Sequence, residues 1–203
     1  MHMRPDDYYH ENPYSIRIAS FDVGLKNLSL CVVDFNSQNA YQIRKWIIIS
    51  LRGKNISDYT IDIVEKLREQ CFGVLDYVLI EQQINRNTQM KVMSHVIQAF
   101  FICDSKIPAN RIKFVSPKLR VDNASIPYSQ VVQKAKEELG LGQSYTRREY
   151  KNLSIHICQQ FLNVDVNKNW NEYFNSCNKK DDLADSFVQA MCWNYGCSIM
   201  DVD

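Results

Sequence analysis

Three β-rich runs follow one another near the start of the chain, and this order constrains the fold more than any other feature. Residues 16–21, 28–35 and 41–51 are rich in the branched and aromatic side chains that favour strands. Residues 24–27 separate the first two runs and predict a hairpin turn. Three strands in succession indicate an antiparallel meander.

Helical and strand patterns alternate through the rest of the chain. The expected elements are a helix from about Ser57 that Ser57 or Asp58 can cap, a strand at 77–80, a helix capped by Asn87 or Thr88, a strand at 112–115, and helices at about 131–139, 146–162 and 181–195. A polar loop is expected before the last helix, through Lys180. This order predicts the α/β class: a mixed five-stranded sheet, with the antiparallel meander and parallel strands, flanked by helices.

The length and composition fit one globular domain. The chain has 203 residues, of which 45% are hydrophobic and 23% charged, as in an ordinary soluble protein. We expect the polar residues 1–14 to form a flexible tail and residues 15–203 to form the domain. No apolar run reaches the roughly 18–20 residues of a membrane span, so no membrane partner is expected. The formal net charge is only +1, so any charge that binds nucleic acid must be local.

The seven cysteines form no recognisable metal or disulfide pattern. Their number is odd, and no pair has the C-x₂-C spacing of a zinc site. Most lie in apolar stretches, so we expect reduced thiols that are buried as small hydrophobic side chains. This indicates an intracellular, reducing compartment.

Four acidic residues lie where such a fold can bring them together. Asp22 ends the first strand, and Glu81 follows the fourth. Asp182 and Asp185 are three residues apart in the last helix, so they share a face at the edge of its apolar stripe. Each acid alone has an ordinary structural explanation, such as capping a turn or meeting a helix dipole. Their joint placement favours a functional site.

Converging carboxylates repel one another unless a cation neutralises them. Mg²⁺ and Mn²⁺ favour oxygen ligands. Two such ions roughly 4 Å apart can activate water and stabilise the departing oxygen of a phosphodiester. The four carboxylates therefore indicate a metal-dependent nuclease.

Short segments around these acids resemble one known family. The segments SFDVGLKN (20–27), VLIEQQ (78–83), VSP (115–117) and KDDLADSF (180–187) are similar to motifs of poxvirus-type Holliday junction resolvases, which belong to the RuvC and RNase H-like superfamily. Their order and approximate spacing agree across about residues 15–195. Mitochondrial resolvases of fungi share the style of the first motif, so the resemblance does not fix the source of the chain.

The resemblance implies an RNase H-like fold and a homodimer that cuts four-way DNA junctions symmetrically. It also implies a role in DNA recombination and, for a viral protein, in concatemer resolution at the host-cell cytoplasm or viral replication site. Carried over position by position, it makes Asp22, Glu81, Asp182 and Asp185 the ligands of Mg²⁺ or Mn²⁺, with two ions per active site.

The choice of Asp182 over Asp181 and the identity of the catalytic lysine need separate arguments. Asp182 is preferred to Asp181 because it lies three residues from Asp185. The catalytic lysine of the family matches Lys151 or, alternatively, Lys118. A partly buried stem is expected for Lys151, because it shares a helical stripe with apolar residues, and such a lysine needs a carboxylate or phosphate partner.

Positive charge gathers between residues 111 and 151. Nine lysines and arginines stand there against four acids, an excess larger than the net charge of the whole chain. These side chains could contact junction phosphates, although each alone also fits a solvated helix face. The candidate DNA-binding residues, from this region and from the acidic motifs, are Lys26, Arg86, Lys118, Arg120, Arg147 and Arg148.

Three alternative functions are compatible with parts of the pattern. Asp-x-Gly on a first strand also opens sugar kinases and actin-like ATPases, but those need two such domains and a second glycine-rich phosphate motif. A related nuclease could cut flaps, bulges or RNA–DNA hybrids with the same carboxylates. A junction-binding protein without cleavage is a third alternative, against which the full set of carboxylates argues. The Met and Phe stripe within residues 90–101 fits either a dimer interface or the core.

Overall fold

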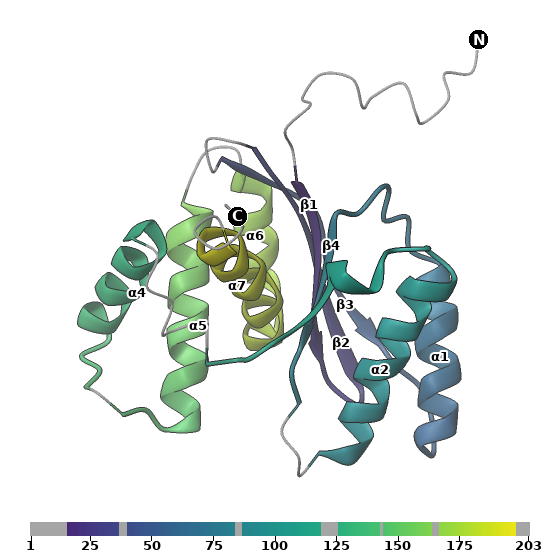
Figure 1. Ribbon diagram of the computed structural model, residues 1–203. Coiled ribbons are helices and arrows are strands. Elements are labelled where there is room, and N and C mark those ends of the chain that lie inside the picture. Colours follow the sequence, from purple (N-terminus) through teal and green to yellow (C-terminus); the bar gives the residue numbers. More distant parts are fainter. Residues whose placement is uncertain are drawn as a thin grey trace.

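One five-stranded sheet with helices on both faces makes up the fold (Figure 1). The computed structural model describes residues 16–36, 40–83, 87–118, 126–142, 144–163 and 167–197. The expected tail, residues 1–14, lies outside these described residues.

The sheet has the strand order β3-β2-β1-β4-β5. Its strands are β1 (Ile16–Val23), β2 (Asn27–Phe35), β3 (Tyr41–Ser50), β4 (Tyr77–Glu81) and β5 (Ile112–Val115). The first three pair antiparallel in sequence, whereas β4 runs parallel to both β1 and β5. The predicted meander and mixed sheet are thereby confirmed, and the hairpin turn lies between β1 and β2 as expected.

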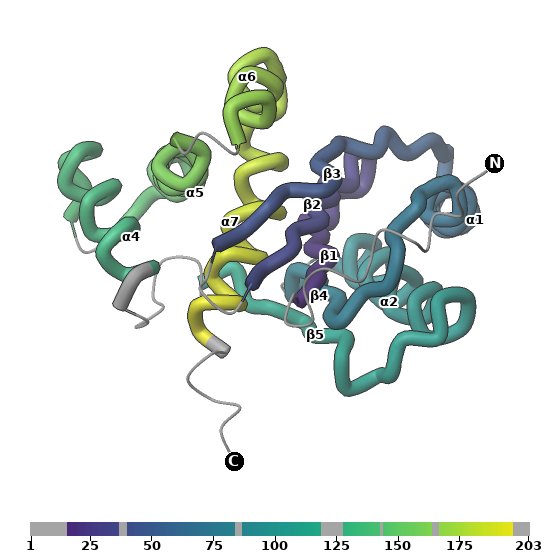
Figure 2. Tube along the Cα trace, turned by 90° about the horizontal axis from the view of Figure 1, so that it is seen from above, coloured from purple at the N-terminus to yellow at the C-terminus, as the bar shows by residue number. Residues whose placement is uncertain are grey.

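Helices form a layer on each side of the sheet (Figures 1 and 2). One side carries α1 (Ile56–Arg68) and α2 (Thr88–Cys103), and the other carries α4 (Ile126–Glu138), α5 (Arg147–Leu162), α6 (Lys168–Ser176) and α7 (Lys180–Cys197). A 3₁₀ turn, η2 (Ala109–Arg111), leads into β5. α7 packs directly on β1, β2 and β3, α5 packs on α7, and α4 packs on α5. No described helix is long and apolar enough to cross a membrane.

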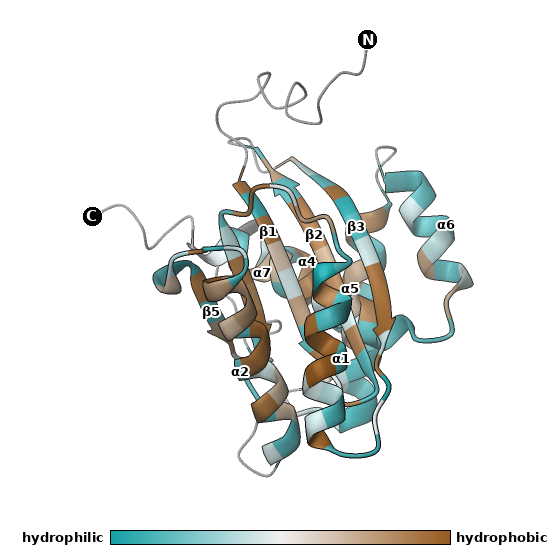
Figure 3. Ribbon diagram, turned by 90° about the vertical axis from the view of Figure 1, so that its right-hand side faces the viewer, coloured by the Kyte–Doolittle hydropathy of each residue, from teal (hydrophilic) through white to brown (hydrophobic). Residues whose placement is uncertain are grey.

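Alternation along the central strands separates two hydrophobic cores. In β1, Ala19 and Phe21 join the core beneath α1 and α2, whereas Ile18 joins the core on the α7 side. Residues Leu30 and Cys31 of β2 divide in the same way. Because both faces of these strands are covered, most of their residues are apolar, as the brown and tan stretches of the sheet in Figure 3 show.

The region expected as a polar loop before the last helix contains α6, so that expectation is wrong. Its aromatic residues Trp170, Tyr173 and Phe174 lie at helical spacing. Phe174 is fully buried and stacks on Trp46 of β3, with ring centroids 5.3 Å apart and planes at 5°. Trp170 Nε1 also donates to Ile43 O at 3.1 Å. Tertiary packing of three aromatic side chains therefore decides the helix, although its other residues are polar.

Two helix starts also differ from expectation. Neither Ser57 nor Asp58 caps α1: the Asn55 side chain accepts from Asp58 N at 3.1 Å. The helix expected near 131–139 begins at Ile126 instead. Fully buried Tyr128 anchors this added turn by stacking on Phe161 of α5.

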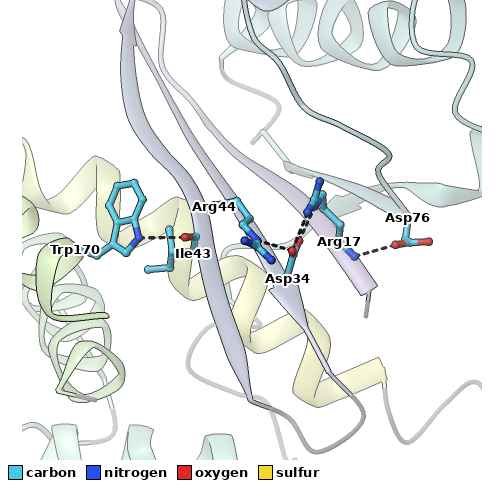
Figure 4. A network of polar contacts seen from close by, with 6 residues as sticks. All are labelled: Arg17, Asp34, Ile43, Arg44, Asp76 and Trp170. Carbon is cyan, nitrogen blue, oxygen red and sulfur yellow. Dashed lines mark hydrogen bonds and ion pairs between the residues drawn. The ribbon is translucent and has the colours of Figure 1, made fainter. Parts of the chain in front are cut away.

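A network of charged side chains links β1, β2 and β3 near the start of β1 (Figure 4). Asp34 of β2 accepts from Arg17 Nε of β1 and from Arg44 Nε of β3, both at 2.6 Å. The main-chain N–H of Arg17 donates to Asp76, just before β4, at 2.8 Å. Burial opposes the charge of Asp34, but the hydrogen bonds and charges of Arg17 and Arg44 outweigh it and lower its pKa. This network stabilises β1, β2 and β3 at the end opposite to the acids.

The structure confirms the expected burial for only some of the cysteines, and it places most of the α2 stripe in the core. Six described cysteines are free, and Cys31, Cys158 and Cys192 are buried. Cys71 and Cys103 are exposed, so the expectation of burial is wrong for these two, which lie near the ends of α1 and α2. In α2, the side chains of Met93, Ile97, Phe100 and Phe101 belong to the core, as the second alternative for this stripe required.

Candidate active site at the carboxyl ends of β1 and β4

The pairing of β1 with β4 brings two of the predicted acids side by side. The strands run parallel, and Phe21 pairs with Ile80. Asp22 and Glu81 are the next residues on each strand, so they emerge at the same end of adjacent strands. Both are half-buried, and Gln83 Nε2 donates to Glu81 at 3.2 Å.

A tight turn follows Asp22 and fixes the direction of the chain there. A Cβ atom on Gly24 would lie 2.4 Å from Asn27 O, so only glycine fits. The carbonyl of Lys26 accepts from Leu51 N at 2.8 Å, which ties the turn to the end of β3. The turn therefore holds Asp22 in place from one side.

The other two predicted acids lie in the first turns of α7, on the helix that crosses β1–β3. Asp182 and Asp185 are half-buried, as their position at the edge of the apolar stripe predicted. Ser186, next to Asp185, lies 2.8 Å from Ser29, measured between the hydroxyl oxygens. Since Ser29 is the pairing partner of Asp22 in the sheet, this contact brings the start of α7 to the strand that neighbours Asp22.

Lys151 joins α5 to the acidic end of α7. Its ammonium forms an ion pair with Asp181. The hydrogen bond to Asp181, together with the charges of Asp181, Asp182 and Asp185, outweighs burial and raises the pKa of Lys151. Asp181, which the three-residue spacing did not favour, is thus the carboxylate that contacts the lysine. The only sequence signal for this role of Asp181 was the expectation that a partly buried Lys151 needs a carboxylate or phosphate partner.

The acids of α7 also act on one another. Burial, reinforced by the neighbouring Asp181 and Asp185, raises the pKa of Asp182. In the described part of the chain, no three His, Cys, Asp or Glu side chains already converge as a formed metal site. The donor set nevertheless fits a hard divalent cation, because carboxylate oxygens dominate it and the acids around Asp182 repel one another.

Four of the six candidate DNA-binding residues lie in or next to the elements that carry the acids and Lys151. Lys26 lies in the turn after Asp22, and Lys118 lies three residues beyond Val115, the sheet partner of Glu81. Arg147 and Arg148 are in the first turn of α5, one turn before Lys151. All four side chains are exposed. Arg86 and Arg120 lie outside the described residues.

Solved structures of three resolvases have a similar fold. The yeast mitochondrial Holliday junction resolvase has 20% identity and a TM-score of 0.57, with 91% of this chain and 82% of that chain covered. A fowlpox virus resolvase, solved with its substrate Holliday junction DNA, has 18% identity, a TM-score of 0.59, and coverage of 92% and 100%. Thermus thermophilus RuvC has 12% identity, a TM-score of 0.54, and coverage of 92% and 98%. The expected RNase H-like fold is confirmed.

The sequence itself matches one family. A comparison with curated proteins finds no match. The family described as Poxvirus A22 protein matches residues 16–196, a range that contains β1 and nearly all of α7 and therefore the predicted acids. This match confirms the resemblance to poxvirus-type resolvases. The chain belongs to the Poxvirus A22 protein family.

Proposed function

We propose that this protein is a structure-specific endodeoxyribonuclease that resolves four-way DNA junctions by metal-dependent hydrolysis. The observation that carries the proposal is the placement of acids from two parallel strand ends and from α7 at one end of a RuvC-like sheet. Relatives of the same fold are resolvases, one of them solved with Holliday junction DNA. The protein thus acts in DNA recombination and, in a viral setting, on replicated concatemers.

Asp22, Glu81, Asp182 and Asp185 are the residues that would hold the metal, Mg²⁺ or Mn²⁺, with two ions per site. When bound, such ions supply activation of water and neutralisation of charge at the scissile phosphate. Lys151 remains protonated, since its ion pair with Asp181 raises its pKa. It therefore serves as a fixed positive charge for the phosphate and not as a base.

The exposed cations Lys26, Lys118, Arg147 and Arg148 are suited to hold the phosphates that flank the scissile bond. A four-way junction has approximate two-fold symmetry, so a homodimer with two such sites would place paired, symmetrical nicks. The free cysteines support action in a reducing, intracellular compartment.

Cleavage of defined DNA structures tests the proposal. Purified protein is incubated with labelled four-way junction, flap, linear duplex and RNA–DNA hybrid, with Mg²⁺, with Mn²⁺ and with chelator. We expect paired nicks in the junction that require metal. The variants Asp22→Asn and Asp182→Asn should cut at least about 10–100-fold more slowly, since loss of even an indirect metal partner costs that much.

Both variants should still bind the junction, because removing negative charge near phosphates does not weaken the attraction. Equal cleavage of flap or hybrid would favour a nuclease of broader specificity. Junction binding without any cleavage would contradict the enzymatic proposal. Full activity of Asp182→Asn would assign the metal ligand to Asp181 instead.

A further inference from the structure

A series of buried hydrogen bonds joins α7 to the sheet next to the acids. Trp46 Nε1 of β3 donates to Leu183 O at 3.0 Å, and Ser186 Oγ donates to the same carbonyl at 3.0 Å. Ser29 Oγ of β2 lies 2.8 Å from Ser186 Oγ. Because the single hydroxyl proton of Ser186 goes to Leu183 O, Ser29 is the donor in the pair.

The side-chain amide of Gln189 joins α7 to β1. Gln189 Nε2 donates to Ser20 Oγ at 3.1 Å and to Phe21 O at 3.3 Å, both in β1. Phe21 O belongs to the peptide group that leads directly into Asp22. The Ser20, Ser29, Ser186 and Gln189 side chains are at most 1% exposed, so this set is an interior feature of the fold.

Stability alone does not explain these polar groups. Within the described residues, Gln189 Oε1 is buried without a hydrogen-bond partner, which is unfavourable in a core. A methionine of similar length would fill the same space without that cost. Apolar packing is non-directional and tolerates rotation of a helix on a sheet, whereas hydrogen bonds to β1, β2 and β3 fix one rotation and one axial position.

We propose that Gln189 and Ser29 are positioning residues that set the rotation of α7, so that Asp182 and Asp185 face the ends of β1 and β4. Leu183 and Ser186, two of the three points of attachment on α7, are the direct neighbours of these two acids. The inference rests on the proposed function, because it assigns the purpose of this rotation to divalent-cation binding by the carboxylates.

Mn²⁺ binding to the metal-free protein, followed by electron paramagnetic resonance of the free ion, tests the inference without DNA. Gln189→Met keeps the length and burial of the side chain but removes both N–H donors. We expect Mn²⁺ affinity to fall about 10–100-fold. Thermal stability without metal should change little, because removing the unpaired Oε1 offsets the loss of the two N–H donations. Single-turnover junction cleavage at fixed metal concentration should slow in parallel.

Ser29→Ala is the second variant, because it deletes one hydroxyl and is tolerated even if Gln189→Met does not fold. Tyr41→Phe is the matched control. It removes a core hydroxyl that donates to Phe161 O at the far end of β3, where Tyr41 pairs with Phe35. The control should change stability but leave Mn²⁺ affinity and cleavage unchanged.

Three outcomes separate the inference from the proposed function. Unchanged Mn²⁺ affinity in the folded variants would overturn the inference, even if the wild-type protein cuts junctions. A wild-type protein without saturable Mn²⁺ binding would overturn it as well. Weakened Mn²⁺ binding in the variants, combined with a wild-type protein that cuts no junction, would sustain the inference and contradict the proposed function.

Discussion

Asp34 of β2 and Asp182 of α7 differ in the charged groups that surround them. Asp34 has two arginine partners, so its pKa is lowered despite burial. Asp182 is also partly buried, but its neighbours Asp181 and Asp185 add to the effect of burial and raise its pKa. Ionised Asp34 therefore stabilises the fold, whereas ionised Asp182 opposes it. Charge that opposes folding is expected at a site built for a cation and not at a structural ion pair.

Replacing Asp34 by Asn should reveal its stabilising role. Arg17 would lose a partner in a largely buried setting, so we expect a loss of about 2–3 kcal/mol in the free energy of unfolding. Because the folded pKa of Asp34 is below its ordinary value of 3.8, its contribution is complete above that pH and disappears as pH falls through the lowered pKa. Urea unfolding of both proteins between about pH 2 and 7 measures the difference.

Asp34→Asn should therefore be less stable than the wild-type protein near neutral pH, and the two should converge at the acid end. A stability difference that is constant across this range would contradict the role of the carboxylate charge. Glu69→Gln is the control, since the Lys66–Glu69 pair is exposed. It should change stability by less than about 0.5 kcal/mol.

Elements whose residues are periodic on their own could be predicted from the sequence, and those fixed by distant partners could not. Successive β-rich runs predicted β1–β3, and Asp22 and Glu81 could be placed because strand ends are visible in the pattern. α6 was missed because Trp170 and Phe174 gain their significance only from Trp46, more than a hundred positions earlier. The contact of Asp181 was missed for the same reason, since its partner Lys151 belongs to another helix.

The turn between β1 and β2 should tolerate no side chain at Gly24. In Gly24→Ala the new Cβ would meet Asn27 O at 2.4 Å, so the turn must shift, at a cost of about 1–3 kcal/mol. Because Asp22 precedes this turn, junction cleavage should fall more than junction binding. Thermal unfolding, gel-shift binding and single-turnover cleavage measure the three effects.

Gly142→Ala provides the control, because a Cβ there would meet nothing within 4 Å. This variant should match the wild-type protein in all three measurements. A Gly24→Ala protein with normal stability and cleavage would show that the turn does not fix Asp22.

At the scale of the whole molecule, the candidate site combines residues from the sheet, α5 and α7. The sheet and α7 hold the acids, and the start of α5 brings Lys151 to them with two exposed arginines one turn away. The net charge of +1 gives the molecule no general excess of positive charge with which to bind DNA. We therefore expect contact with phosphates to depend on a few cations near the acids, and the contribution of each should be separable by its kinetic effect.

Lys151→Ala should slow cleavage at saturating enzyme while leaving junction affinity nearly unchanged, because its ammonium lies beside the acids of α7. Arg147→Ala and Arg148→Ala should do the reverse. Each should weaken binding and reduce its salt dependence by about one unit of slope if one phosphate contact is lost. If Lys151 only supports the helix, its removal would cost a fraction of a kcal/mol and leave the single-turnover rate unchanged. An unchanged rate in Lys151→Ala together with a slow Lys118→Ala would assign the catalytic lysine to the segment after β5, beside Glu81 and not beside α7.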